Sequence, residues 1–126
     1  TIEETHANYD DAVTLVLEHM AAGNRAEVMM ATHNQASIEH AITLMQKLGI
    51  RPHDGVSFGQ LLGMADNITF PLGAGGYKAY KYIPYGKVGE TIPYLLRRAQ
   101  ENSAMLGGAS HERGLLVKEI RRRIFG

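Results

Sequence analysis

Three short apolar runs alternate with helical segments along this sequence, and that alternation constrains the fold more than any other feature. The expected strands and helices, in order, are 27–31, 36–48, 56–63, a short weak helix within 64–76, 78–84 and a helix around Tyr94. Strands that alternate with helices over three successive units predict parallel strands joined by right-handed crossovers. The pattern therefore indicates an α/β fold, either an open sheet or a closed barrel.

Two further helices are expected at the ends of this pattern. Residues 9–22 carry apolar side chains at helical spacing and stop at Gly23-Asn24. Residues 110–126 form an amphipathic segment with three consecutive arginines, Arg121 to Arg123. We expect this terminal helix to dock on the body of a single unit, 1–126, because its apolar stripe needs burial; a role at a membrane surface is the alternative.

The composition argues against several classes of function. The 13 Lys and Arg residues balance 13 Asp and Glu residues, so broad nucleic-acid binding, which needs a basic face, is disfavoured. The chain has no cysteine, which excludes disulfides and thiolate metal sites. Its six histidines lack metal-ligand spacing, and no Gly-x-Ser-x-Gly elbow occurs. We expect no metal, no covalent hydrolysis and no targeting segment within these residues.

One stripe of side chains carries the clearest chemical signal. On a helix, Tyr94, Arg97, Arg98 and Glu101 stand at i, i+3, i+4 and i+7 and lie along one face. Arginine grips a planar carboxylate through two parallel hydrogen bonds, so adjacent arginines beside a tyrosine indicate a small anionic ligand. The alternative is a solvated face on which Glu101 pairs with one of the arginines.

Chemistry in parallel α/β folds gathers where strands end and the chain turns into the next helix. Here those positions are Thr32-His33-Asn34, Leu61-Leu62-Gly63 and Tyr82-Ile83-Pro84. The histidine of the first turn can orient a ligand, or can cap the following helix together with the asparagine. Leu61 offers an apolar wall, or is core. Tyr82 is suited to packing against a small ring, or belongs to the core or rim.

Taken together, four ordered motifs resemble the C-terminal third of proline dehydrogenase, especially the eukaryotic mitochondrial type. They are Ala31-Thr32-His33-Asn34, Phe58-Gly59-Gln60-Leu61-Leu62-Gly63-Met64, Tyr80-Lys81-Tyr82-Ile83-Pro84-Tyr85-Gly86 and Tyr94-Leu95-Leu96-Arg97-Arg98-Ala99-Gln100-Glu101-Asn102. The resemblance implies strands six to eight and helix eight of a distorted (β/α)8 TIM barrel. It also implies FAD-dependent oxidation of L-proline to Δ1-pyrroline-5-carboxylate, quinone as the electron acceptor, and the matrix side of the mitochondrial inner membrane.

The resemblance carries roles over to particular residues. It implies that the proline carboxylate is clamped, and its ring enclosed, by Arg97, Arg98, Tyr82, Tyr94 and Leu61. It assigns to the cofactor side of the site Thr32, His33, Asn34 and Glu101, the last by holding the arginine pair in place. Tyr82 favours proline, because related hydroxyproline dehydrogenases tend to have a small polar residue there.

The length departs from the resemblance. A complete (β/α)8 barrel needs about 250 residues, and this sequence has 126. The resemblance therefore implies that the N-terminal part of the barrel comes from a second chain or from a further segment. Two other hypotheses stay open: a hydroxyproline dehydrogenase of the same fold, and a non-enzymatic α/β module that binds a carboxylate or another protein through the arginine stripe.

Overall fold

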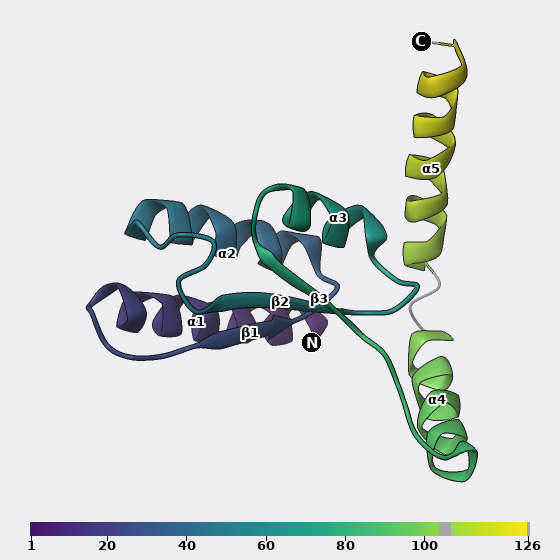
Figure 1. The fold of residues 1–126 in the computed structure, drawn as a ribbon, viewed down its shortest axis with the longest axis horizontal. Coiled ribbons are helices and arrows are strands. Elements are labelled where there is room, and N and C mark those ends of the chain that lie inside the picture. Colours follow the sequence, from purple (N-terminus) through teal and green to yellow (C-terminus); the bar gives the residue numbers. More distant parts are fainter. Residues whose placement is uncertain (104–106, 126) are drawn as a thin grey trace. The chain divides into compact units, whose positions relative to one another are not determined.

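The computed structural model describes residues 1–103 and 107–125, and the side chains of 1–101 and 113–125. The chain divides into two compact units, Thr1–Tyr82 and Ile83–Gly126, and each is described by itself. Their elements are α1 (Ile2–Ala21), β1 (Val28–Ala31), α2 (Gln35–Leu48), β2 (Val56–Leu61), α3 (Asp66–Ala74), β3 (Lys78–Tyr82), α4 (Val88–Ser103) and α5 (Gly107–Phe125) (Figure 1). The expected single unit stays a prediction.

The first unit contains a parallel sheet in the order β1-β2-β3. Met30 is opposite Phe58, which in turn is opposite Ala79, and Leu61 is opposite Tyr82. The alternating order and the parallel direction expected from the sequence are thus confirmed. Closure of the sheet into a barrel stays a prediction.

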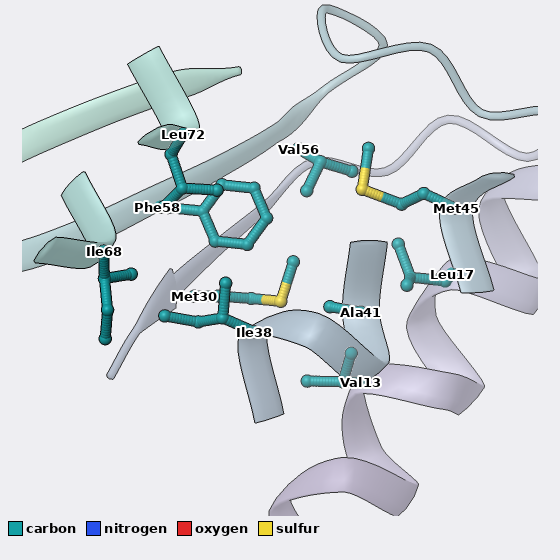
Figure 2. Close-up of a cluster of buried hydrophobic side chains, with 10 residues drawn as sticks. All are labelled: Val13, Leu17, Met30, Ile38, Ala41, Met45, Val56, Phe58, Ile68 and Leu72. Atoms are coloured by element: carbon teal, nitrogen blue, oxygen red, sulfur yellow. The ribbon is translucent and has the colours of Figure 1, made fainter. Parts of the chain in front are cut away.

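The helices α1, α2 and α3 all contribute to one core against a single face of this sheet. Phe58 is fully buried at its centre and meets Tyr77 edge-on, with ring centroids 5.8 Å apart. Figure 2 shows the buried apolar side chains, which are Val13, Leu17, Met30, Ile38, Ala41, Met45, Val56, Phe58, Ile68 and Leu72. This face of the sheet therefore needs no further cover.

The opposite face of the sheet, here called the open face, is much more exposed than the helix-covered face. Strand alternation and register place on it Met29, Ala31, Ser57, Gly59, Leu61, Lys78, Tyr80 and Tyr82. Met29, Tyr80 and Tyr82 are 58%, 51% and 52% exposed. Parallel sheets are normally covered on both faces, so this exposure indicates a surface built to receive more protein or a ligand.

Helix boundaries follow local signals. α1 begins at Ile2, earlier than the expected Tyr9, because Thr1 and Glu4 form a capping box that supports a polar first turn. α2 starts after its cap Asn34 and ends at Leu48, and its C-cap Gly49 has a left-handed φ of 72° that suits glycine. The weak helix expected within 64–76 is present as α3.

The second unit consists of α4 and α5. α4 contains the Tyr94 stripe, as expected. On α5, Glu119 pairs with Arg122 and Arg123, each at 2.8 Å, and hydrogen bonds from these two arginines lower the pKa of Glu119 to about 2. Docking of the terminal helix on the body stays a prediction. In the ranges that the structure describes, no helix has the length and apolar character needed to cross a membrane.

Candidate functional site

The turn after β1 is organised by its own polar side chains. Asn34 Oδ1 accepts a hydrogen bond from the Ala36 N–H at 3.1 Å, and the Asn34 N–H donates to Thr32 Oγ1 at 3.0 Å. Asn34 therefore caps α2, as the capping alternative proposed. The Thr32 hydroxyl accepts in this contact, and a hydroxyl that accepts can still donate its own hydrogen.

His33 links the ends of two strands. Its Nε2 accepts a hydrogen bond from the Leu61 N–H at 3.0 Å. A backbone N–H can only donate, so Nε2 must be unprotonated and a neutral His33 carries its proton on Nδ1. His33 is thus a bridge between the ends of β1 and β2.

A buried glutamine extends this link to α3. Gln60 is 2% exposed; its Nε2 donates to the Thr32 carbonyl at 3.4 Å and its Oε1 accepts from Thr69 Oγ1 at 3.0 Å. Sequence reasoning missed this residue as a site component. The available signal was its position, because strand alternation places Gln60 on the same buried face as Val56 and Phe58.

Leu61 and Tyr82 lie side by side at the carboxyl edge of the open face. They are register partners, and the Leu62 N–H donates to the Tyr82 carbonyl at 3.1 Å. Tyr82 is 52% exposed, so the structure does not place it in the core. The first unit therefore brings together His33, Leu61 and Tyr82, three of the residues singled out from the sequence, at one edge of the sheet.

The second unit holds the arginine stripe on α4. Arg98 Nη2 pairs with Glu101 Oε1 at 2.7 Å, and the Arg98 guanidinium lies 5.3 Å from the centre of the Tyr94 ring. Arg98 Nε is buried and has no hydrogen-bond partner in the part of the chain that the structure describes. Arg97 is exposed.

Two features of this arrangement bear on the two interpretations of the stripe. The pairing with Glu101 is what a solvated face would show. A buried donor without an acceptor is different, because such a group costs about 1 to 3 kcal/mol unless something satisfies it. Arg98 is held by Glu101 and Tyr94, and its buried Nε is a donor without an acceptor among the described residues. The binding of an anionic ligand by this stripe stays a prediction.

The comparison with known families identifies the source of these motifs. A sequence profile of the family described as proline dehydrogenase matches residues 1–111. The chain belongs to the proline dehydrogenase family. The resemblance inferred from the four motifs, including its eukaryotic mitochondrial type, is therefore confirmed.

Individual relatives agree with this assignment. The chain is 49% identical to mitochondrial proline dehydrogenase 1 of Bos taurus over 125 residues, covering 98% of this chain and 21% of that protein. It is 48% identical to the hydroxyproline dehydrogenase of Homo sapiens over 124 residues, covering 97% of this chain and 27% of that protein. The chain thus spans 21% and 27% of the length of these two relatives. No solved structure gives a significant match.

Proposed function

We propose that this chain forms the carboxyl-terminal part, strands six to eight and helix eight, of the (β/α)8 barrel of an FAD-dependent proline dehydrogenase. The reaction is the oxidation of L-proline to Δ1-pyrroline-5-carboxylate, with quinone as the electron acceptor. The observation that carries the proposal is Arg98, a cation held on two sides with a buried Nε donor that lacks an acceptor among the described residues. Family membership supplies the reaction class.

Arg97 and Arg98 bind the proline carboxylate in this proposal. Two guanidinium groups on neighbouring positions offer more donors than one carboxylate can accept, so the substrate is both neutralised and oriented. Glu101 keeps Arg98 extended through its 2.7 Å ion pair. Tyr94 supports the guanidinium through its ring face.

The proline ring needs an apolar enclosure. Leu61 supplies a flat aliphatic wall, and its register partner Tyr82 supplies an exposed aromatic face beside it. Tyr94 completes the set of residues that we assign to the ring. Holding a small ring in one orientation is itself a large part of catalysis, because it replaces a chance encounter with a fixed approach.

The polar residues after β1 fit the edge of a flavin. We assign Thr32 and His33 to this edge, because a hydroxyl and an imidazole are polar groups of the kind that the carbonyl oxygens and ring nitrogens of an isoalloxazine bind. The open face leaves space beside Gly59, since among the described residues a Cβ placed there meets only Met29 Sδ at 3.6 Å and Met29 Cγ at 3.9 Å. Asn34 shapes the same turn. FAD, when bound, supplies the hydride acceptor N5 for the hydrogen on proline C5.

The open face then becomes part of the barrel interior. It bears exposed tyrosines and a methionine, while the curated relatives extend far beyond the region matched here. We propose that the remaining strands of the barrel, in the same polypeptide or in a second chain, cover this face. By analogy with relatives named mitochondrial proline dehydrogenase 1, we propose that the protein lies in mitochondria. We further propose the matrix side of the inner membrane, which only the family resemblance implies.

A hydroxyproline dehydrogenase is the second candidate, because relatives with that name are 46% to 48% identical to this chain. Tyr82 decides between the two substrates in our proposal, since its ring occupies space that a 4-hydroxyl group would need. The test is kcat/KM of the full-length protein with L-proline and with trans-4-hydroxy-L-proline, using a quinone acceptor. We expect proline to be preferred; a preference for hydroxyproline would replace the first candidate by the second.

A further inference from the structure

Lys81 occupies an unusual position for a lysine. It lies on β3 between Tyr80 and Tyr82, but on the helix-covered face of the sheet, and its side chain is only 17% exposed. Its Nζ forms an ion pair with Asp66 Oδ1 at 2.8 Å and donates to the Met64 carbonyl at 2.5 Å. A largely buried ammonium group needs such partners, because desolvation without them is costly. The ammonium group therefore holds the Met64 carbonyl and Asp66, the first residue of α3.

That turn, residues 62–65, joins β2 to α3 and begins directly after Leu61. Ala65 has φ 53° and ψ 39°, and it is the one non-glycine residue with positive φ among those that the structure describes. A left-handed alanine is strained and persists only where surrounding contacts hold it. Met64 and Asp66, the residues on either side of Ala65, are the two that Lys81 contacts.

Backbone hydrogen bonds tie the same turn to the ends of β3 and β2. The Leu62 N–H donates to the Tyr82 carbonyl at 3.1 Å, and the Met64 N–H donates to the Leu61 carbonyl at 3.2 Å. Two neighbouring residues of β3 therefore hold the turn. Lys81 holds it through its side chain, on the helix-covered face, and Tyr82 holds it through its backbone carbonyl. A shift of the turn relative to β3 would therefore act on the Leu62–Tyr82 hydrogen bond, which lies next to the Leu61–Tyr82 pair.

We propose that Lys81 is a positioning residue that fixes the Leu61–Tyr82 wall by clamping the turn 62–65 through Asp66 and the Met64 carbonyl. Lys81 acts from the helix-covered face, opposite the open face, and does not itself contact the ring that the wall encloses. The substrate part of this inference rests on the function proposed above. The clamping of the turn does not.

The test uses the full-length protein and three variants. Lys81→Met keeps an unbranched side chain of similar length but removes the ammonium group. Asp66→Asn removes only the ion pair and leaves the contact with the Met64 carbonyl. Arg51→Met is the matched control, because Arg51 also pairs with an aspartate of the first unit, Asp54 at 2.9 Å, but Arg51 is 82% exposed and precedes β2.

Two measurements are made on each protein. Amide hydrogen exchange of Leu62 and Met64 reports how often the turn opens, and it does not require any enzymatic activity. Steady-state kinetics with proline report how tightly Leu61 and Tyr82 enclose the substrate ring. Looser enclosure that weakens binding of the ground state and of the transition state alike raises KM and leaves kcat unchanged. A merely destabilising substitution would instead lower the active fraction, and with it the apparent kcat, at constant KM.

For Lys81→Met we expect exchange at both amides to accelerate about tenfold, and KM for proline to rise about tenfold with kcat within about twofold. Asp66→Asn should show the same changes at smaller size, and Arg51→Met neither. Unchanged exchange, or faster exchange with unchanged KM, overturns the proposal. If the unmodified protein does not oxidise proline, the proposed function fails, while exchange at Leu62 and Met64 still decides whether Lys81 clamps the turn.

Discussion

Replacing Arg98 by methionine gives the sharpest test of the carboxylate clamp. The substitution keeps a long unbranched side chain but removes the guanidinium group that pairs with Glu101 at 2.7 Å and lies 5.3 Å from the Tyr94 ring. Loss of one partner of a buried, hydrogen-bonded charge pair weakens binding by about 2 to 5 kcal/mol. Arg98 is 34% exposed, so we expect the lower part of this range, about 2 to 3 kcal/mol, or roughly 30- to 150-fold in Kd.

The same substitution should leave the stability of the protein almost unchanged. The ion pair with Glu101 is partly solvated and contributes no more than about 1 kcal/mol. Against that loss, methionine removes a buried Nε donor that has no partner among the described residues, which relieves a desolvation penalty of similar size. Lost affinity without lost stability is therefore the signature of a binding residue at this position.

The assay is isothermal titration of the full-length protein with cyclopentanecarboxylate, which keeps the ring and the carboxylate of proline but lacks the nitrogen. Arg122→Met is the matched control, because Arg122 pairs with Glu119 at the same i,i+3 spacing on α5 and is 69% exposed. Thermal unfolding is recorded for each variant. If Arg98→Met binds the ligand as tightly as the control does, the clamp is not at Arg98.

Three further predictions concern the core, the terminal helix and the substrate. Phe58→Ala should destabilise the protein by about 3 to 5 kcal/mol in urea unfolding, because a fully buried ring is lost; a loss below about 1 kcal/mol would show that the site is not tightly packed. The carboxyl group of Glu119, with its pKa lowered from 4.5 to about 2 by its arginine partners, should contribute stability above pH 4.5 that disappears as the pH falls towards 2; an NMR titration near the ordinary value would contradict this pairing. Tyr82→Ser should raise the ratio of kcat/KM for hydroxyproline over proline by about tenfold, and an unchanged ratio would remove Tyr82 from substrate selection.

Much of the fold was predictable because it depends on local periodicity. The apolar runs and the helical spacing gave the order and the parallel direction of the strands, which the register of the sheet confirms. The start of α1 was not predicted, since residues 2–8 have no apolar stripe and helix formation there depends on the capping box between Thr1 and Glu4. Apolar periodicity gives no signal for such polar helical turns.

The candidate site was predictable in part for a similar reason. Strand ends could be read from the sequence, and they place His33, Leu61 and Tyr82 at one edge of the sheet. The hydrogen bond from the Leu61 N–H to His33 Nε2 joins residues 28 positions apart, and it follows only from the register of two strands. The contacts of Lys81 likewise depend on how a turn folds against a neighbouring strand. Pairings of this kind have no local signal.

The most direct test of the central claim is the visible spectrum of the full-length protein under anaerobic conditions, before and after addition of L-proline. The account predicts the absorption bands of an oxidised flavin in the purified protein and their bleaching by proline. A protein without these bands, or with bands that proline leaves unchanged, would contradict the assignment of a flavin-dependent proline dehydrogenase.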